Sequence, residues 1–484
     1  MSEADRSGVV LPGGVGGSGL LHALLARAVD AFPQALGPLR LPDPAGLRTR
    51  YAALIPRFEW LRRESAERCA IARFLVREST ACLRFGDAEG ERDLADALAS
   101  EAAPLPLERV ALPSQAGFTP KVALGGRVFA GEQLDVVATQ LARRHLATQP
   151  AVDALRSLGA RVREAGVSLR GERFVLLGAG AELSPVYALL EAGADVLWLD
   201  VVPPPIDHLL DPRLGGTLAY VPGGVDLLAR PAEVRATVLA FAAGGPVRIG
   251  MYAFANGGAR AARLALTMNA LVRSLPSGTA ASLHYALSPT SVSPVSPEDA
   301  RRADDRRARD VGSWRTRLRA RAFAPAHLGE GMRRLSACVV SAQGASYQVA
   351  EYVGKRLAAE AFLAYGSGLD GAATRAPLAV TADMLPICTT RSLDNPVLAA
   401  AVLGAPRFDM LISAPDTAAG VGASLLVEAL LAPPTNDHDA REGLFARQFH
   451  GGALAQPYAL DGLIRRAALR GMAQRPKLAL ELLR

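Results

Sequence analysis

Tyr352 and Lys355 are the two side chains of this sequence whose types and spacing best suit proton transfer. They lie three residues apart in ASYQVAEYVGKRLAAEAF, which has the periodicity of an amphipathic helix. Two residues at this spacing lie about 60° apart around a helix and share a face. A tyrosine whose pKa of about 10 is lowered by a nearby cation can donate a proton at neutral pH. The structural alternative is that Glu351 and Lys355 form an ordinary i,i+4 ion pair while Tyr352 packs in the core.

A glycine turn at Gly178 and Gly180 is the second candidate for chemistry. The segment RFVLLGAGAELSPVYALLEAGADVLWLDVV predicts a strand, a turn, a helix and a second strand. Backbone N–H groups at such a turn can bind a pyrophosphate, with the small Ala181 beside it and Ser184 as a candidate helix N-cap. Asp200 follows Gly178 by 22 residues, where an acid binds ribose hydroxyls. We therefore expect these residues to bind a dinucleotide.

The turn departs from the complete G-x-G-x-x-G motif, since Leu183 stands where the third glycine would be. One alternative is a structural strand-helix-strand unit that binds nothing. Another is an S-adenosylmethionine-dependent methyltransferase. Those enzymes usually carry an acid two residues before the first glycine, where this chain has Leu176, so this alternative is disfavoured. Asp200 would repel a 2′-phosphate, which favours NAD over NADP as the cofactor.

Apolar runs alternate with helical segments after Gly171, which predicts an α/β fold with a doubly wound parallel sheet of the Rossmann type. After the first two strands the runs are TLAYV, PVRIGMYAF, ASLHYALS, PLAVTA and FDMLISA. Residues 1–169 have helical periodicity, so we expect an N-terminal all-α domain before a catalytic domain over residues 170–484. Residues at about 294–332 are too polar for a core element and predict a helical surface insertion.

The order of these elements, from about Gly171 to Pro433, resembles that of the short-chain dehydrogenase/reductase superfamily. Three further segments carry the resemblance: VDLL after the third strand, ANGGA after the fourth and LPICTT after the sixth. In that superfamily the equivalent segments meet the adenine, form a turn beside the cofactor and touch the nicotinamide amide. The resemblance therefore implies cofactor contacts at Asp226, Leu227, Asn256, Gly257, Pro386 and Thr389.

The resemblance also implies a catalytic set. A serine at the end of strand five orients the substrate carbonyl in that superfamily, and Ser288 is the first choice here, with Ser291 the second. Asn269 would help to hold a proton-relay water. The superfamily places its tyrosine four residues before its lysine, whereas Tyr352 precedes Lys355 by three; Tyr347 lies two turns, about 12 Å, from the lysine.

The function that the resemblance implies is NAD(P)-dependent oxidation or reduction at an alcohol or carbonyl centre of a small molecule. In this reading Tyr352 is the acid/base, and Lys355 lowers its pKa and binds ribose. The alternative within the same fold is a non-catalytic protein that binds a dinucleotide or a partner.

The net charge of +7 is spread along the chain, so we do not expect a nucleic-acid partner. The exception is Arg301–Arg321, which holds nine arginines and could grip a CoA-linked substrate or a carrier protein. A solvated helix of mixed charge is the alternative for this segment. The sequence is compatible with a homo-oligomer and does not decide it.

Neither a metal site nor a membrane partner is expected. The cluster Asp437, His438, Asp439 and His450 fits no metal template, and the four cysteines lack C-x-x-C spacing. No apolar run reaches the ~18 residues of a membrane span, and the N-terminus lacks the features of a signal peptide. We therefore expect a cytoplasmic protein.

Overall fold

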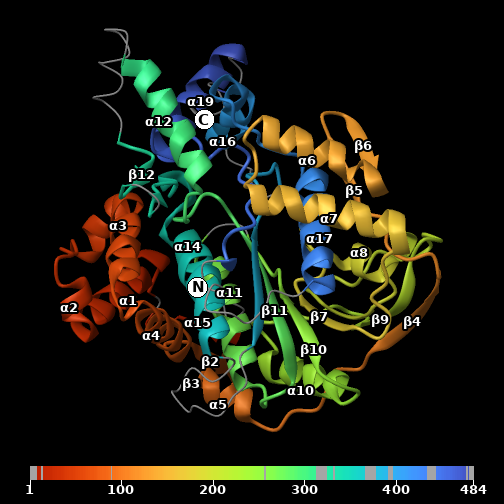
Figure 1. Ribbon diagram of the computed structural model, residues 1–484. Coiled ribbons are helices and arrows are strands. Elements are labelled where there is room, and N and C mark those ends of the chain that lie inside the picture. Colours follow the sequence, from red (N-terminus) through yellow and green to blue (C-terminus); the bar gives the residue numbers. More distant parts are fainter. Residues whose placement is uncertain are drawn as a thin grey trace.

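A seven-stranded sheet organises the computed structural model (Figure 1). The structure describes residues 8–475 and 478, apart from 12, 14, 89, 256–257, 312–323, 331–332, 366–377, 391–395 and 433–442. The strands, in their order across the sheet, are β14 (Ala379–Met384), β11 (Ala280–Leu287), β10 (Val247–Met251), β7 (Arg173–Leu177), β8 (Asp195–Leu199), β9 (Gly215–Tyr220) and β4 (Glu108–Pro113). The first six are parallel, and β4 pairs antiparallel with β9 at the edge.

The strand order is compatible with a Rossmann-like α/β fold, because the six parallel strands follow the doubly wound pattern with the first and fourth adjacent at the centre. The predicted strands are confirmed at β7 to β11 and at β14. The strand predicted for FDMLISA is wrong. That segment forms one isolated bridge, between Ser413 and Cys388, and the amide of Leu411 donates to the carbonyl of Gly451 instead of to a ladder.

Helices cover both faces of the sheet. On β7, Val175 and Leu177 point into one core cluster and Phe174 and Leu176 into the other, as the two-residue period of a strand requires. The first cluster includes α10 (Pro231–Ala242) and α11 (Gly258–Ser274), and the second includes α6 (Leu134–Arg143), α7 (Gln149–Ala165), α8 (Val186–Glu191) and α17 (Pro415–Leu431). Figure 1 shows α7 and α17 on one side of the sheet and α11 on the other.

One helical segment connects the sheet to the N-terminal helices. It consists of α14 (Ala345–Gln348), the π-helix η5 (Val349–Leu357) and α15 (Ala358–Tyr365). This segment packs on α11 and on α1 (Gly17–Ala31), α3 (Pro44–Glu64) and α4 (Arg68–Ala81) within the first core cluster. A Cβ at Gly354 would lie 2.7 Å from Cβ of Ala265, so the close approach of η5 to α11 requires a glycine.

The prediction of an all-α region over residues 1–169 is not confirmed, because strands occur throughout it. They are β1 (Gly8–Val10), β2 (Arg84–Asp87), β3 (Gly90–Asp93), β4, β5 (Lys121–Leu124) and β6 (Arg127–Ala130). These strands are short, and β3 is exposed along its whole length, so it lacks the apolar alternation that would reveal it. The boundary near residue 169 stays a prediction.

The remaining elements are short or lie at the periphery. They are α2 (Pro33–Leu36), α5 (Leu94–Ala99), α9 (Ile206–Leu209), α12 (Pro297–Val311), α16 (Pro396–Gly404), α19 (Leu460–Gln474), β12 (His327–Leu328), β13 (Leu335–Ser336), η3 (Gly131–Gln133), η4 (Ser341–Gln343) and η7 (Ala405–Phe408). The described part of the predicted insertion is α12, together with β12 and the chain on either side of it.

Candidate functional site

The glycine turn lies beside a cavity of about 210 Å³ at the carboxyl ends of β7, β8 and β10. Gly178 has φ +88°, and a Cβ at this position would lie 2.2 Å from the backbone nitrogen of Ala253. A side chain is therefore excluded, and the turn passes directly over the end of β10. Gly180 and Ala181 follow on the cavity wall.

Two carboxylates face this cavity. Asp200 Oδ2 accepts a hydrogen bond of 2.9 Å from the amide of Gly180. Burial raises the pKa of Asp200, although the amides of Gly180, Val201 and Val202 act in the opposite direction. Asp226 accepts from Leu228 N at 2.9 Å and from Arg260 Nη2 at 2.7 Å. These acceptors suit a ligand that presents hydroxyl or amino groups.

Leu227 and Arg260 also line the first cavity. Leu227 was predicted, but Arg260 was missed. Arg260 comes from α11, 34 residues after its partner Asp226, and no local motif marks it.

Ser184 is not the N-cap that the sequence suggests. Helix α8 begins at Val186 after Pro185, and no side chain caps it. The Ser184 hydroxyl is buried without a hydrogen-bond partner among the described residues. Because α8 has only six residues, its N-terminus gives little support for anion binding.

A second cavity, of about 320 Å³, meets the first at Gly180, Ala181 and Phe254. Three of the hydroxyl side chains that line it are linked to one another. Ser288 Oγ lies 2.8 Å from Thr290 Oγ1, which donates to Tyr347 Oη at 3.2 Å. Burial and the charge of Glu351 raise the pKa of Tyr347, against the opposite effect of Ser288 and Thr290. Tyr347 is therefore a neutral phenol at pH 7 and holds its proton more tightly than a free tyrosine does.

Glu351 and Lys355 line the same cavity. Lys355 Nζ donates to Glu351 Oε1 at 2.5 Å and to the carbonyl of Ala286 at 3.2 Å, and Glu351 Oε2 accepts from Ser288 N at 3.2 Å. Tyr347, Glu351 and Lys355 follow one another at intervals of four residues. The Glu351–Lys355 ion pair that the sequence analysis gave as the structural alternative is thus present, and it lines the second cavity.

The structure does not bring Tyr352 and Lys355 together. Tyr352 is fully buried, donates to Glu59 Oε2 at 2.7 Å and packs edge-on against Phe58. Burial and the neighbouring carboxylate raise its pKa well above 10. The cause of the separation is η5: a π-helix has i→i+5 hydrogen bonds and a wider turn than the α-helix that the prediction assumed. Tyr352 therefore takes the core position of the structural alternative.

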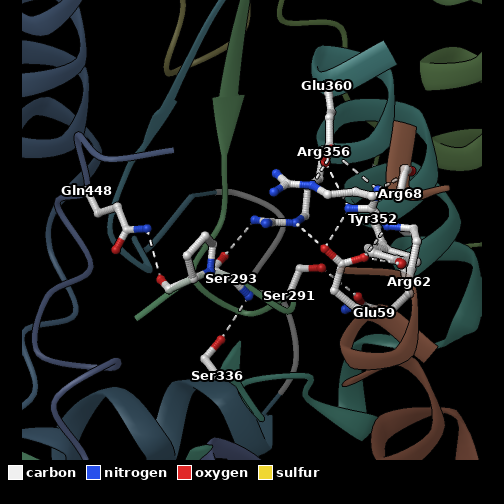
Figure 2. A network of polar contacts seen from close by, with 12 residues as sticks. Glu59, Arg62, Arg68, Ser291, Ser293, Ser336, Tyr352, Arg356, Glu360 and Gln448 are labelled. Carbon is white, nitrogen blue, oxygen red and sulfur yellow. Dashed lines mark hydrogen bonds and ion pairs between the residues drawn. The ribbon is translucent and has the colours of Figure 1, made fainter. Parts of the chain in front are cut away.

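Glu59 belongs to a buried charge network, defined as Glu59, Arg62, Arg68, Tyr352, Arg356 and Glu360 (Figure 2). Arg62 donates to Glu59 at 2.7 and 2.9 Å and to Glu360 at 2.8 Å, and all three side chains are fully buried. Arg68 donates to Glu360 at 2.5 Å. The network joins α3 and α4 to η5 and α15.

Four other predicted site residues turn away from the cavities or lie outside the described residues. Ser291 donates to Gln348, and Asn269 donates to the Gly354 carbonyl at 2.7 Å while accepting from Tyr285. Asn269 thus fixes η5 to α11. The structure does not describe Asn256 and Gly257.

The LPICTT segment reaches the second cavity with a shift of one residue. Pro386 lines the cavity as predicted, but the Thr389 amide and hydroxyl face the Ser413 carbonyl, and Thr390 lines the cavity in its place. Sequence matching could not distinguish two adjacent threonines. Thr290 was also missed, although it follows Ser288 by only two residues.

No protein-family model matches this chain, and a search of curated proteins finds no match. Within the described residues, no three His, Cys, Asp or Glu side chains form a group that could hold a metal ion. His450 faces Asp299 at 3.2 Å, and Asp437, His438 and Asp439 lie outside the described residues. The described helices include none that is both long and apolar enough to cross a bilayer.

Proposed function

We propose that this chain is an NAD(P)-dependent oxidoreductase that acts on an alcohol or carbonyl centre of a small molecule. The observation that carries the proposal is the meeting of two cavities at Gly180, one lined by carboxylates and the other by hydroxyls. Both open at the carboxyl ends of the parallel strands, where ligands bind in doubly wound sheets. The resemblance to short-chain dehydrogenases/reductases supports the same proposal.

The first cavity fits the adenosine part of a dinucleotide. The close approach at Gly178 leaves no room for a side chain between the turn and β10, and Asp200 offers an acceptor for ribose hydroxyls. Arg260 is paired with Asp226, and the two carboxylates of this cavity, Asp200 and Asp226, would repel a 2′-phosphate. NAD is therefore favoured over NADP.

A bound nicotinamide cofactor would supply or accept the hydride. The chain would supply the proton, and Tyr347 takes the role that the sequence suggested for Tyr352. Its phenol is neutral, and Thr290 and Ser288 hold its oxygen in the second cavity. Lys355, fixed by Glu351 and the Ala286 carbonyl, would present its ammonium group to the cofactor ribose.

A non-catalytic dinucleotide-binding protein is the second candidate. The position of Tyr352 favours it, because Lys355 has a carboxylate as its neighbour where a reductase has a tyrosine. This candidate predicts the same cofactor affinity without turnover.

Calorimetric titration with NADH, NADPH and S-adenosylmethionine tests the proposal. We expect NADH to bind most tightly. In Gly180→Val the new side chain would crowd Asp200 on the wall of the first cavity, since a Cβ there lies 3.3 Å from Asp200 Oδ2 and 3.2 Å from Trp198. We expect NADH affinity to fall at least tenfold in this variant.

Gly223→Val is the matched control, because Gly223 is exposed, has no atom within 4 Å of an added Cβ and lines neither cavity. Absence of binding by both dinucleotides would contradict the proposal. Binding of NADH without reduction of any member of a panel of aldehydes and ketones would favour the second candidate.

A further inference from the structure

A groove of about 860 Å³ lies apart from both cavities and shares no lining residue with them. Its walls come from the junction of α3 and α4, the start of α7, the chain that leads into α12 and the chain that leads into β13. Five arginines line it: Arg63, Arg68, Arg301, Arg333 and Arg334. Two carboxylates, Glu64 and Glu298, line the same groove, and two more, Glu360 and Asp304, pair with Arg68 and Arg334 from outside it, so the five arginines still outnumber these four carboxylates.

Three of these arginines, Arg301, Arg333 and Arg334, have N–H donors that a ligand can use. Arg301 has an exposed side chain and no ion pair within the described part of the chain. Arg333 is 81% exposed and meets Glu64 only at 3.8 Å. Arg334 binds Asp304 at 2.8 Å through its terminal nitrogens, but its Nε is buried and has no partner among the described residues. A guanidinium has five N–H donors, so one ion pair does not exhaust it.

Gln448 provides an independent observation on the groove wall (Figure 2). Its side chain is 3% exposed, and its Nε2 donates to the carbonyls of Phe445 and Pro294 at 2.7 and 3.1 Å. These two bonds fix the orientation of the amide. Its Oε1 is buried and accepts from no donor among the described residues. Buried acceptors are nearly always satisfied by protein or by ordered water, so this oxygen is an acceptor that a ligand with a donor can satisfy.

We propose that this groove binds an organic phosphate that also carries a hydroxyl or amide donor. The guanidinium fork matches phosphate oxygens, and a phosphate at pH 7 carries enough charge to offset much of the excess. Arg301, Arg333 and Arg334 hold the phosphate, and the hydroxyl or amide group of the ligand donates to Gln448 Oε1. The site is independent of the dinucleotide proposal and gives a role to the first residue of the arginine-rich segment.

Calorimetry with glucose 6-phosphate, glucose and inorganic phosphate at constant ionic strength tests this site. We expect glucose 6-phosphate to bind, inorganic phosphate to bind more weakly and glucose not to bind. Arg301→Ala/Arg333→Ala removes two charged groups of hydrogen-bond donors and should weaken the affinity for glucose 6-phosphate at least tenfold. Both arginines are exposed, and circular dichroism will show that this variant folds.

The control variant is Arg109→Ala/Arg127→Ala, which removes two exposed arginines on strands outside the groove and should leave the affinity unchanged. NADH affinity should be the same in both double variants. The proposal is overturned if glucose 6-phosphate fails to bind the wild type or binds the groove variant equally well. Loss of phosphate binding in Gly180→Val alone would overturn it too, by placing the anion at the glycine turn. Equal affinity for inorganic phosphate and glucose 6-phosphate would also overturn it, because it would show that no hydroxyl of the ligand contributes a hydrogen bond to Gln448.

Discussion

Two faces of the helical segment formed by α14, η5 and α15 carry the same kinds of side chain into different surroundings. One face presents Tyr347, Glu351 and Lys355 to the second cavity. The other carries Tyr352, Arg356 and Glu360 into the buried charge network, where they meet Glu59 and Arg62 (Figure 2). Each face thus holds a tyrosine, a carboxylate and a cation.

The difference lies in the surroundings of the two tyrosine hydroxyls. Glu59 Oε2 accepts from both Tyr352 and Arg62, and a hydroxyl held in this way has no route to a ligand. On the cavity face the Tyr347 oxygen is held by hydroxyls, and its side chain lines the second cavity. A tyrosine near a cation is therefore a catalytic candidate only where its surroundings leave room for a reactant.

The largest effect is expected when the cavity face loses its phenol. Tyr347→Phe removes the proposed proton donor and should lower turnover about 10²–10⁴-fold, the usual contribution of a positioned general acid. The measurement is the steady-state rate of NADH oxidation with a carbonyl substrate identified from the panel. NADH affinity serves as the control and should change little. Full activity in this variant would show that the proton comes from another group.

Removing a carboxylate from the buried charge network should lower the free energy of unfolding instead. Glu59→Leu leaves Arg62 and Arg356 with one buried carboxylate between them, and the loss of one partner of a buried ion pair costs about 3–5 kcal/mol. Urea unfolding measures this change. Asp135→Ala is the matched control, since its ion pair with Arg156 is exposed and should contribute at most about 1 kcal/mol. Equal losses of unfolding free energy in the two variants would show that the buried ion pair stabilises the fold no more than the exposed one.

The same network predicts an acid-dependent loss of stability. Burial alone would raise the pKa of Glu59, but Arg62, with help from Arg356 and Tyr352, lowers it from 4.5 to about 2. Because the folded-state pKa lies below the unfolded one, the stabilisation is complete above about pH 4.5 and is lost as the pH falls toward 2. Between pH 5 and pH 3 we expect Glu59 to account for about 2 kcal/mol of lost unfolding free energy.

Glu59→Gln provides the comparison for this acid effect. It should be less stable at every pH but lose less between pH 5 and pH 3 than the wild type. Urea unfolding at both pH values measures the difference. Parallel loss in the two proteins would mean that other carboxylates, such as Glu360, whose pKa is also lowered, dominate acid unfolding.

Local patterns predicted the parts of the structure that depend on neighbours in sequence. The strand, glycine turn and acid from Arg173 to Asp200 lie where the sequence indicated, and Gly180 binds Asp200 directly. Ser288 and Lys355 also reach one cavity, because strand order fixes which chain ends meet.

The rest depended on contacts that no local pattern contains. Glu59, the partner of Tyr352, lies 293 residues away in sequence. The π-helix changed the residue spacing on which the choice between Tyr347 and Tyr352 rested. The exposed strand β3 and the edge strand β4 gave too little apolar alternation to be distinguished from helix or loop.

The smallest effect is expected for Tyr352→Phe, which also separates the two faces most cleanly. Phenylalanine keeps the packing against Phe58, and Glu59 keeps both hydrogen bonds from Arg62. The variant therefore loses one hydrogen bond and should be destabilised by about 1 kcal/mol in urea unfolding. NADH affinity and turnover should match the wild type, because the lost hydroxyl touches neither cavity. A large fall in turnover with unchanged stability would assign the proton to Tyr352 and require the helix to rearrange when a ligand binds.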